Sequence, residues 1–214
     1  MTRLVILDFD GTLADTQPII IASLQHTLRE MHLAPRTDAE CRSIIGLPLA
    51  QCFVTLCGVD DDTAERCADI YRRVFDELNT DGMVTLFPHV DETITALHSR
   101  GLQLAICSSR GRPTLEGYIR RFHWETLVGM VISANDVEHH KPHPEPVERI
   151  LAALDMAPGD AMVVGDTNYD ILMGRNAGCH TCGVTYGNQT ADALRNAGAD
   201  HLIDDFAQLL SLVR

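Results

Sequence analysis

The chain lacks any long apolar run. Hydrophobic residues make up 45% of its 214 positions, but they occur in short, interrupted stretches, whereas a membrane-spanning helix needs about 20 consecutive apolar residues. The first stretch, Leu4–Leu7, ends at Asp8 and is too short for the apolar region of a secretory signal peptide. We therefore expect a cytoplasmic protein with no membrane partner.

Positive charge is also scarce. The 17 Lys and Arg residues face 30 Asp and Glu residues, which gives a formal net charge of -13. Such a surface repels nucleic acid and anionic lipid, and no basic stripe in the sequence would override it. Neither is expected as a partner. An anionic substrate would need local positive charge at its site, and a divalent cation would supply it.

The cysteines lack the spacing of a metal site. Their number, seven, is odd, and without an export signal reduced thiols are the expectation. Cys179-His180-Thr181-Cys182 is formally a CxxC, but no second pair follows at zinc-ribbon spacing. Since His180, Cys182 and Val184 alternate as one face of a strand would, we interpret this segment as structural.

Strand-like and helix-like patterns alternate along most of the chain. Residues 3–8 form a continuous apolar run, which is typical of a strand buried on both faces. Similar runs occur at residues 102–107, 130–133, 161–165, 181–185 and 201–203. Helical patterns lie between them at residues 90–99, 115–121, 146–154, 171–177 and 190–196. This alternation predicts an α/β fold with a doubly wound, Rossmann-like parallel sheet.

One segment interrupts this alternation. Between about Asp15 and Gly82 the sequence shows helical patterns but no convincing strand. Pro18 opens one helix, and Asp62 is expected to cap another, whose Ile70, Val74 and Leu78 would share one face.

An all-helical insertion after the first strand indicates a second, smaller domain. We expect residues 1–14 and 83–214 to form the α/β core and residues 15–82 to form a helical cap. Gly11 and Gly82 would lie near the two hinges.

Polar side chains follow the predicted strands at their carboxyl ends. In chain order they are Asp8, Asp10, Ser108, Ser109, Lys141, Asp166 and Asp170. A solvated turn would explain the Asp8–Gly11 segment equally well when it is taken alone. The distribution over several strand ends argues against chance, because the carboxyl ends of parallel strands meet at one edge where ligands bind. Clustered carboxylates there are costly without a cation.

These residues resemble the four motifs of the haloacid dehalogenase superfamily. The matching segments are Asp8-Phe9-Asp10-Gly11-Thr12-Leu13, Ser108, Lys141-Pro142 and Gly165-Asp166-Thr167-x-x-Asp170. The helical insertion resembles the cap of that superfamily. Gly46-Leu47-Pro48, Phe87-Pro88 and Pro144-Glu145-Pro146 make the sequence most similar to the phosphoglycolate phosphatase branch.

The resemblance implies a role for each motif residue. Asp8 would be the nucleophile, and Asp10 would act first as a general acid and then as a base. Phosphoryl oxygens would be bound by Ser108, Ser109 and Lys141. Magnesium would be held by Asp8, the main-chain carbonyl of Asp10, Asp166 and Asp170, the last directly or in the second shell.

Positions outside the motifs stay open. Gly46 either faces substrate or simply ends a cap helix. Arg72 and Arg73 either reach down from the cap to an anionic group or lie on a solvated helix face. Arg110 follows Ser108 closely enough to line the pocket.

Three histidines surround the motif lysine. His139, His140 and His143 lie in a proline-rich segment next to Lys141. We interpret them as part of a surface turn rather than as a transition-metal site, since the carboxylates already supply the oxygen ligands that magnesium prefers.

The expected activity is that of a magnesium-dependent phosphatase acting on a small phosphorylated metabolite, with phosphoglycolate as first choice. Inorganic pyrophosphatase is the alternative. A phosphosugar mutase fits less well, because the Lys-Gly-x-Ser-Arg loop of its cap is missing. A phospho-accepting signalling domain would not retain Asp10, which promotes hydrolysis. Monomer and homodimer both remain open.

Overall fold

The computed structural model describes residues 2–80 and 82–213. Residues 1, 81 and 214, which fall within the ranges predicted for the core and the cap, lie outside the described residues.

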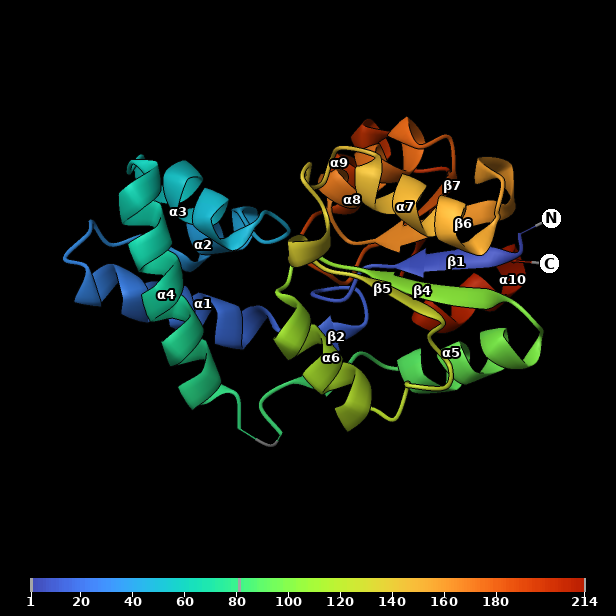
Figure 1. The fold of residues 1–214 in the computed structure, drawn as a ribbon, viewed down its shortest axis with the longest axis horizontal. Coiled ribbons are helices and arrows are strands. Elements are labelled where there is room, and N and C mark those ends of the chain that lie inside the picture. The colour runs from blue at the N-terminus through green and yellow to red at the C-terminus, as the bar shows by residue number, and fades with distance from the viewer. Residues whose placement is uncertain (1, 81, 214) are drawn as a thin grey trace.

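A six-stranded parallel sheet lies at the centre of the larger part of the molecule (Figure 1). In spatial order its strands are β5 (Met130–Ile132), β4 (Gln103–Cys107), β1 (Leu4–Leu7), β6 (Ala161–Gly165), β7 (His180–Val184) and β8 (His201–Ile203). Leu4 of β1 pairs with Gln103 on one side and Ala161 on the other. All four residues of β1 have no exposed surface, which explains its continuous apolar run.

Helices cover both faces of this sheet. One face carries α5 (Val90–Ser99), α6 (Arg112–Arg121) and α10 (Leu209–Leu212); the other carries α7 (Glu145–Leu154), α8 (Asn168–Asn176) and α9 (Ala191–Ala197). Short 3-10 turns occur at Ala134–Asp136, Pro158–Asp160 and Phe206–Gln208. Val5 and Leu7 pack into one apolar cluster, and Leu4 and Ile6 into the other. The predicted doubly wound α/β fold is confirmed.

Four helices lie together beyond the carboxyl end of β1 (Figure 1). They are α1 (Gln17–Glu30), α2 (Asp38–Ser43), α3 (Leu49–Cys57) and α4 (Asp61–Leu78). We call residues 17–78 the helical segment. β2 (Ala14–Asp15) and β3 (Thr85–Leu86) pair in an antiparallel ribbon that brings the two ends of this segment together. Asp15, expected to begin the strand-free insertion, therefore belongs to a short strand.

The structure corrects the prediction for α4. Asp60, not Asp62, caps this helix, because its side chain accepts a hydrogen bond from the Thr63 N–H at 2.8 Å. Of the predicted apolar face only Val74 is buried, and Leu78 is 36% exposed. The buried face consists of Ala64, Cys67, Ala68, Tyr71, Val74 and Phe75. These small and aromatic residues carry a weaker hydropathy signal than the aliphatic repeat of Ile70, Val74 and Leu78 on which the prediction rested.

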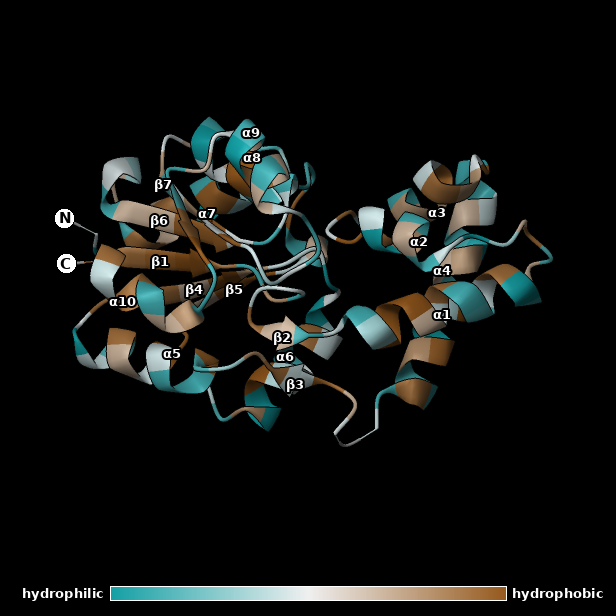
Figure 2. Cartoon of the chain, turned by 180° about the vertical axis from the view of Figure 1, so that it is seen from behind, coloured by the Kyte–Doolittle hydropathy of each residue, from teal (hydrophilic) through white to brown (hydrophobic). Residues whose placement is uncertain are grey.

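The distribution of hydropathy agrees with this packing. Figure 2 shows hydrophobic colour concentrated on the strands and hydrophilic colour on much of the helical surface. Among the described residues, no helix combines the length and apolar character needed to cross a bilayer. All seven cysteines carry free thiols, as predicted.

Candidate active site

The carboxyl ends of the two central strands supply the first acids of the site. Asp8 follows β1, and its backbone N–H donates to the Val164 carbonyl of β6 at 2.9 Å. Asp166 follows β6 and is fully buried. Adjacent parallel strands thus place two carboxylates side by side at the edge where ligands bind in such sheets.

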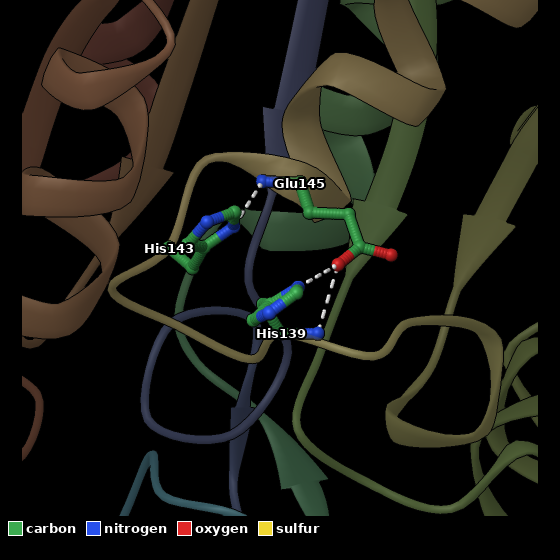
Figure 3. A group of neighbouring side chains, drawn as sticks. All are labelled: His139, His143 and Glu145. Carbon is green, nitrogen blue, oxygen red and sulfur yellow. Dashed lines mark hydrogen bonds and ion pairs between the residues drawn. The ribbon is translucent and has the colours of Figure 1, made fainter.

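The loop between β5 and α7 brings Lys141 to the site. Glu145, in the first turn of α7, organises this loop by accepting hydrogen bonds from the backbone N–H groups of Glu138 and His139, at 3.1 and 2.8 Å. These bonds lower the pKa of Glu145 to about 2, and the bond from the Glu138 N–H contributes most. His139 Nδ1 lies 2.9 Å from the same carboxylate, and the rings of His139 and His143 stack (Figure 3). His139 and His143 are exposed and lie in a turn, as expected. Their ring nitrogens and the Glu145 carboxylate lie within 4.8 Å of one another, so the absence of a transition-metal role stays a prediction.

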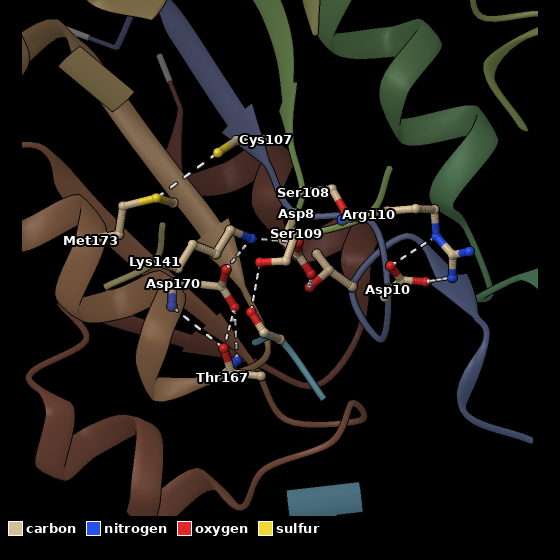
Figure 4. Close-up of polar contacts among 12 residues, drawn as sticks. Asp8, Asp10, Cys107, Ser108, Ser109, Arg110, Lys141, Thr167, Asp170 and Met173 are labelled. Carbon is tan, nitrogen blue, oxygen red and sulfur yellow. Dashed lines mark hydrogen bonds and ion pairs between the residues drawn. The ribbon is translucent and has the colours of Figure 1, made fainter. Parts of the chain in front are cut away.

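Lys141 lies between two carboxylates (Figure 4). Its Nζ donates to Asp8 Oδ1 at 2.6 Å and to Asp170 Oδ1 at 2.7 Å. The lysine side chain is 3% exposed. Burial lowers its pKa, but the attraction of Asp170 and Asp8 outweighs burial and raises the pKa well above its ordinary value. Lys141 therefore remains a fixed positive charge beside Asp8.

Three acids form a buried cluster around this lysine. Asp8, Asp166 and Asp170 each offer an oxygen within 4.8 Å of the others. Burial, and then the negative charge of Asp170, raise the pKa of Asp166 to about 7. Burial also raises the pKa of Asp8 well above its usual range, with the neighbouring acids adding to the effect and Lys141 opposing it. One lysine does not compensate this much buried negative charge, so the cluster can hold a divalent cation.

Local turns explain how the acids come so close. Gly11 has a φ of +85°, and a Cβ atom there would lie 2.3 Å from Asp166 Oδ2, so the turn after β1 requires glycine. Thr167 caps α8, and its hydroxyl donates to Asp170 Oδ2 at 2.6 Å. This cap places Asp170 in the first turn of a helix that begins at Asn168, three residues before the predicted start.

Asp10 points away from the acid cluster. Its carboxylate accepts two hydrogen bonds from the Arg110 guanidinium, from Nε at 3.1 Å and from an Nη at 2.5 Å (Figure 4). Arg110 lies in the loop after β4, and its guanidinium lies over the rings of Phe75 and Tyr118, at 4.7 and 5.4 Å from their centroids. The predicted acid–base residue is therefore in an ion pair within the core, and the guanidinium of that pair packs against Phe75 of the helical segment.

The two serines after β4 have different partners. Ser108 is 4% exposed, and its Oγ accepts the Arg110 backbone N–H at 3.2 Å, which leaves its hydroxyl proton for a ligand. The Ser109 hydroxyl donates to the Gly46 carbonyl at 2.7 Å. Ser108 is thus arranged to bind an anion, whereas Ser109 contacts the helical segment.

The cap arginines lie elsewhere. Arg72 pairs with Asp69 at 2.6 Å, and Arg73 pairs with Glu30 at 2.6 Å and Glu77 at 3.1 Å. Both side chains are about half exposed, at 55% and 49%. The structure supports the solvated-face interpretation of Arg72 and Arg73, because their partners belong to the helical segment itself.

Two further residues hold the acids in place and were missed in the sequence. Asn188 donates to Asp166 Oδ2 from its backbone N–H and from its side-chain amide, each at 2.7 Å. The Thr12 hydroxyl donates to Asp166 Oδ1 at 3.2 Å. Asn188 follows β7, so it could have been found from the expectation that polar residues at the carboxyl ends of parallel strands meet. Thr12 lies within the first motif.

The chain is similar to known proteins over most of its length. The family model described as haloacid dehalogenase-like hydrolase matches residues 5–184. Pyrophosphatase PpaX of Anoxybacillus flavithermus is 32% identical over 209 residues, covering 98% of this chain and 95% of the relative. Pyrophosphatase PpaX of Bacillus pumilus is 34% identical, with the same coverage.

Solved structures show the same fold. A crystal structure described as a haloacid dehalogenase-like hydrolase from Bacteroides fragilis superposes with a TM-score of 0.92 at 28% identity, covering 98% of this chain and all of that one. A predicted phosphoglycolate phosphatase from Haemophilus somnus gives a TM-score of 0.87 at 24% identity, covering 99% and 97% of the two chains. With the four motifs converging as described, this chain belongs to the haloacid dehalogenase-like hydrolase family.

Proposed function

We propose that the protein is a magnesium-dependent phosphatase that transfers the phosphoryl group of a small substrate first to Asp8 and then to water. The observation that carries this proposal is the contact between Lys141 Nζ and Asp8 Oδ1 at 2.6 Å, at the end of the central strand. It places a buried carboxylate next to a fixed positive charge, which would draw in the phosphoryl group that the carboxylate attacks.

The charges of the site fit one divalent cation. The acids are Asp8, Asp10, Asp166 and Asp170, and the cations are Lys141 and Arg110. When all four acids are ionised, two negative charges remain, and one magnesium ion would neutralise them. The donors are oxygens, as magnesium prefers. Asp8, Asp166, Asp170 and the Asp10 carbonyl would hold it, and it would offset the charge of the phosphoryl oxygens.

The protein side chains divide the reaction between them. A carboxylate oxygen of Asp8 forms a bond to phosphorus while the bond to the leaving oxygen breaks, and Lys141 and Ser108 hold the phosphoryl oxygens. Asp10 donates a proton to the leaving oxygen. In the second half, Asp10 accepts a proton from the attacking water, inorganic phosphate departs, and the Asp8 carboxylate is restored.

Two candidate substrates differ in the leaving group that they would place in the site. The motifs resemble those of phosphoglycolate phosphatases, which supports phosphoglycolate. The relatives that are 32–34% identical over nearly the whole chain are named pyrophosphatases, which supports pyrophosphate. Both substrates are small, whereas a phosphoprotein is not expected to fit between the acid cluster and the helical segment.

A panel of substrates tests the proposal. Purified protein is given phosphoglycolate, pyrophosphate, small sugar phosphates, an aryl phosphate and a phosphoprotein, and kcat/KM is measured with magnesium and with excess chelator. We expect turnover of small substrates only, abolished by the chelator and restored by magnesium. Full activity in chelator, or preference for the phosphoprotein, would contradict the proposal.

A further inference from the structure

The ion pair of Arg110 and Asp10 is largely shielded from solvent. The Arg110 side chain is 9% exposed and that of Asp10 is 14% exposed. Phe75 belongs to α4 and Tyr118 to α6, so the aromatic rings that face the guanidinium come from two separate parts of the molecule. Such walls keep water away and strengthen the attraction between Arg110 and any anion.

Arg110 is chemically suited to bind more than Asp10. Its planar guanidinium donates a matched pair of hydrogen bonds, a geometry that fits carboxylates and phosphates alike. Its backbone N–H contacts Ser108, which is placed to bind the transferred phosphoryl group. Lys141 already forms ion pairs with Asp8 and Asp170. Arg110 is thus a second buried cation beside the phosphoryl site, on the side where Asp10 must meet the leaving oxygen.

The observed pairing conflicts with the first half of the reaction. As a general acid, Asp10 must carry a proton toward the leaving oxygen. In the structure both of its carboxylate oxygens instead accept hydrogen bonds from Arg110. The pair must separate before Asp10 can act, and separation would leave a buried guanidinium without a counter-charge, which is costly. A second anion would remove that cost.

We propose that Arg110 is the specificity-determining residue of the enzyme and binds an anionic group on the leaving part of the substrate in exchange for Asp10. This inference rests on the proposed function. The anion is a carboxylate or a phosphate, which the guanidinium binds in the same way. Its arrival releases the Asp10 carboxylate, which takes up a proton from solvent and then donates that proton to the leaving oxygen. A substrate with a neutral leaving group cannot displace Asp10 and reacts slowly.

Phosphoglycolate and 2-hydroxyethyl phosphate provide a matched pair of probes. Both release a primary alcohol of nearly equal size, and only the first carries a carboxylate. We expect the parent enzyme to favour phosphoglycolate by roughly 10-fold or more in kcat/KM. Arg110→Gln should lower kcat/KM for phosphoglycolate by roughly 10²-fold, and it should raise rather than lower kcat/KM for 2-hydroxyethyl phosphate, because Asp10 is no longer held by the guanidinium. Arg110→Lys, which keeps the charge but loses the paired donors, should fall in between.

Arg112→Gln is the control. Arg112 also makes a two-point contact with a carboxylate, that of Asp136, at 3.2 and 2.6 Å, but its side chain is 37% exposed. The Arg112→Gln variant should leave the ratio of kcat/KM between phosphoglycolate and 2-hydroxyethyl phosphate unchanged. Pyrophosphate is assayed in parallel, and a loss confined to pyrophosphate would support the inference with phosphate as the bound anion.

The outcomes separate the inference from the proposed function. If Arg110→Gln slows both probes and pyrophosphate equally, or if the parent shows no preference for an anionic leaving group, the inference is wrong and the phosphatase assignment stands. If the parent hydrolyses none of these substrates nor an aryl phosphate, the proposed function fails and the inference with it. Thermal melting shows whether Arg110→Gln is folded. If it is not, the inference is tested by the parent's preference for phosphoglycolate over 2-hydroxyethyl phosphate and by the kinetics of Arg110→Lys.

Discussion

The two sides of the active site are built differently. The phosphoryl side consists of Asp8, Lys141, Asp166 and Asp170, supplied by the loops after the strands and by the first turn of α8, and these residues lie against one another. The leaving-group side consists of Asp10 and Arg110 from the core together with Gly46 and Phe75 from the helical segment.

Under the proposed function, this difference separates the residues that would carry out the chemistry from those that would set specificity. Hydrogen-bonded parallel strands and the first turn of α8 hold the phosphoryl side, and the helical segment reaches it through the hydrogen bond from Gln17 Nε2 to Asn188 Oδ1 at 3.0 Å. The leaving-group side depends on contacts between two parts of the chain that are joined by a short ribbon and can be changed without disturbing the sheet. We expect changes on the phosphoryl side to affect all substrates alike and changes on the leaving-group side to affect substrates selectively.

The largest expected effect is on the phosphoryl side. Asp8→Asn should lower kcat by roughly 10⁴-fold or more for every substrate, because an amide cannot serve as the nucleophile. Covalent incorporation of labelled phosphate should disappear as well. Near-parental activity of this variant would show that Asp8 is not the nucleophile.

Asp10→Asn should distinguish protonation of the leaving group from attack by Asp8. It keeps Asp8 and Lys141 but removes the general acid, so kcat for an alkyl phosphate should fall by roughly 10²–10⁴-fold. Formation of the phosphoenzyme from an activated aryl phosphate should fall much less, because that leaving group needs little protonation; single-turnover kinetics measure this step. An equal loss of phosphoenzyme formation with both substrates would place Asp10 on the phosphoryl side.

Magnesium should stabilise the phosphoryl side in a pH-dependent way. Burial raises the pKa of Asp166 to about 7 in the folded protein, against 3.8 for the ordinary group. The folded state therefore binds more protons between these values, and the metal-free protein loses stability from this group as pH rises from about 4 to 7. Magnesium replaces the proton, so the stabilisation by magnesium should increase over the same range.

Thermal melting with and without magnesium measures this effect. Magnesium at 100-fold over its Kd adds about 2.7 kcal/mol, or a rise in Tm of about 5–10 °C for a chain of this size. We expect that rise at pH 8 and a much smaller one at pH 5.5. Asp166→Asn should abolish it, whereas Asp69→Asn, whose side chain is 77% exposed, should not. An equal rise at both pH values would contradict the assignment of Asp166 as a ligand.

The smallest expected effect concerns the contact between the core and the helical segment. Ser109→Ala removes the hydrogen bond to the Gly46 carbonyl, which should cost about 1 kcal/mol of stability and raise KM a few-fold for small alkyl phosphates. The aryl phosphate should be unaffected. Ser43→Ala is the control, because the Ser43 hydroxyl bonds to Glu40 within the helical segment itself. If Ser109→Ala instead slowed every substrate, Ser109 would belong to the phosphoryl side.

Much of the fold could be predicted because its signals are local. Continuous apolar runs marked the strands, and all six strands of the main sheet were placed within one residue at each end. The exposed and buried faces of α4 were not predicted correctly, since Cys67, Ala68 and Tyr71 give a weak hydropathy signal and acquire their burial from α1 and α3. Packing between helices, not periodicity, decided that face.

The sequence by itself determined the phosphoryl side. Parallel strands end at one edge of a sheet, so the order of strands and polar residues was enough to predict that Asp8, Lys141, Asp166 and Asp170 meet. The tertiary structure alone decided that Arg110 pairs with Asp10 across 100 positions of sequence, that Ser109 contacts Gly46, and that Arg72 and Arg73 face away. These contacts depend on side-chain direction and on how the helical segment sits beside the sheet, and no periodic pattern in the chain encodes either.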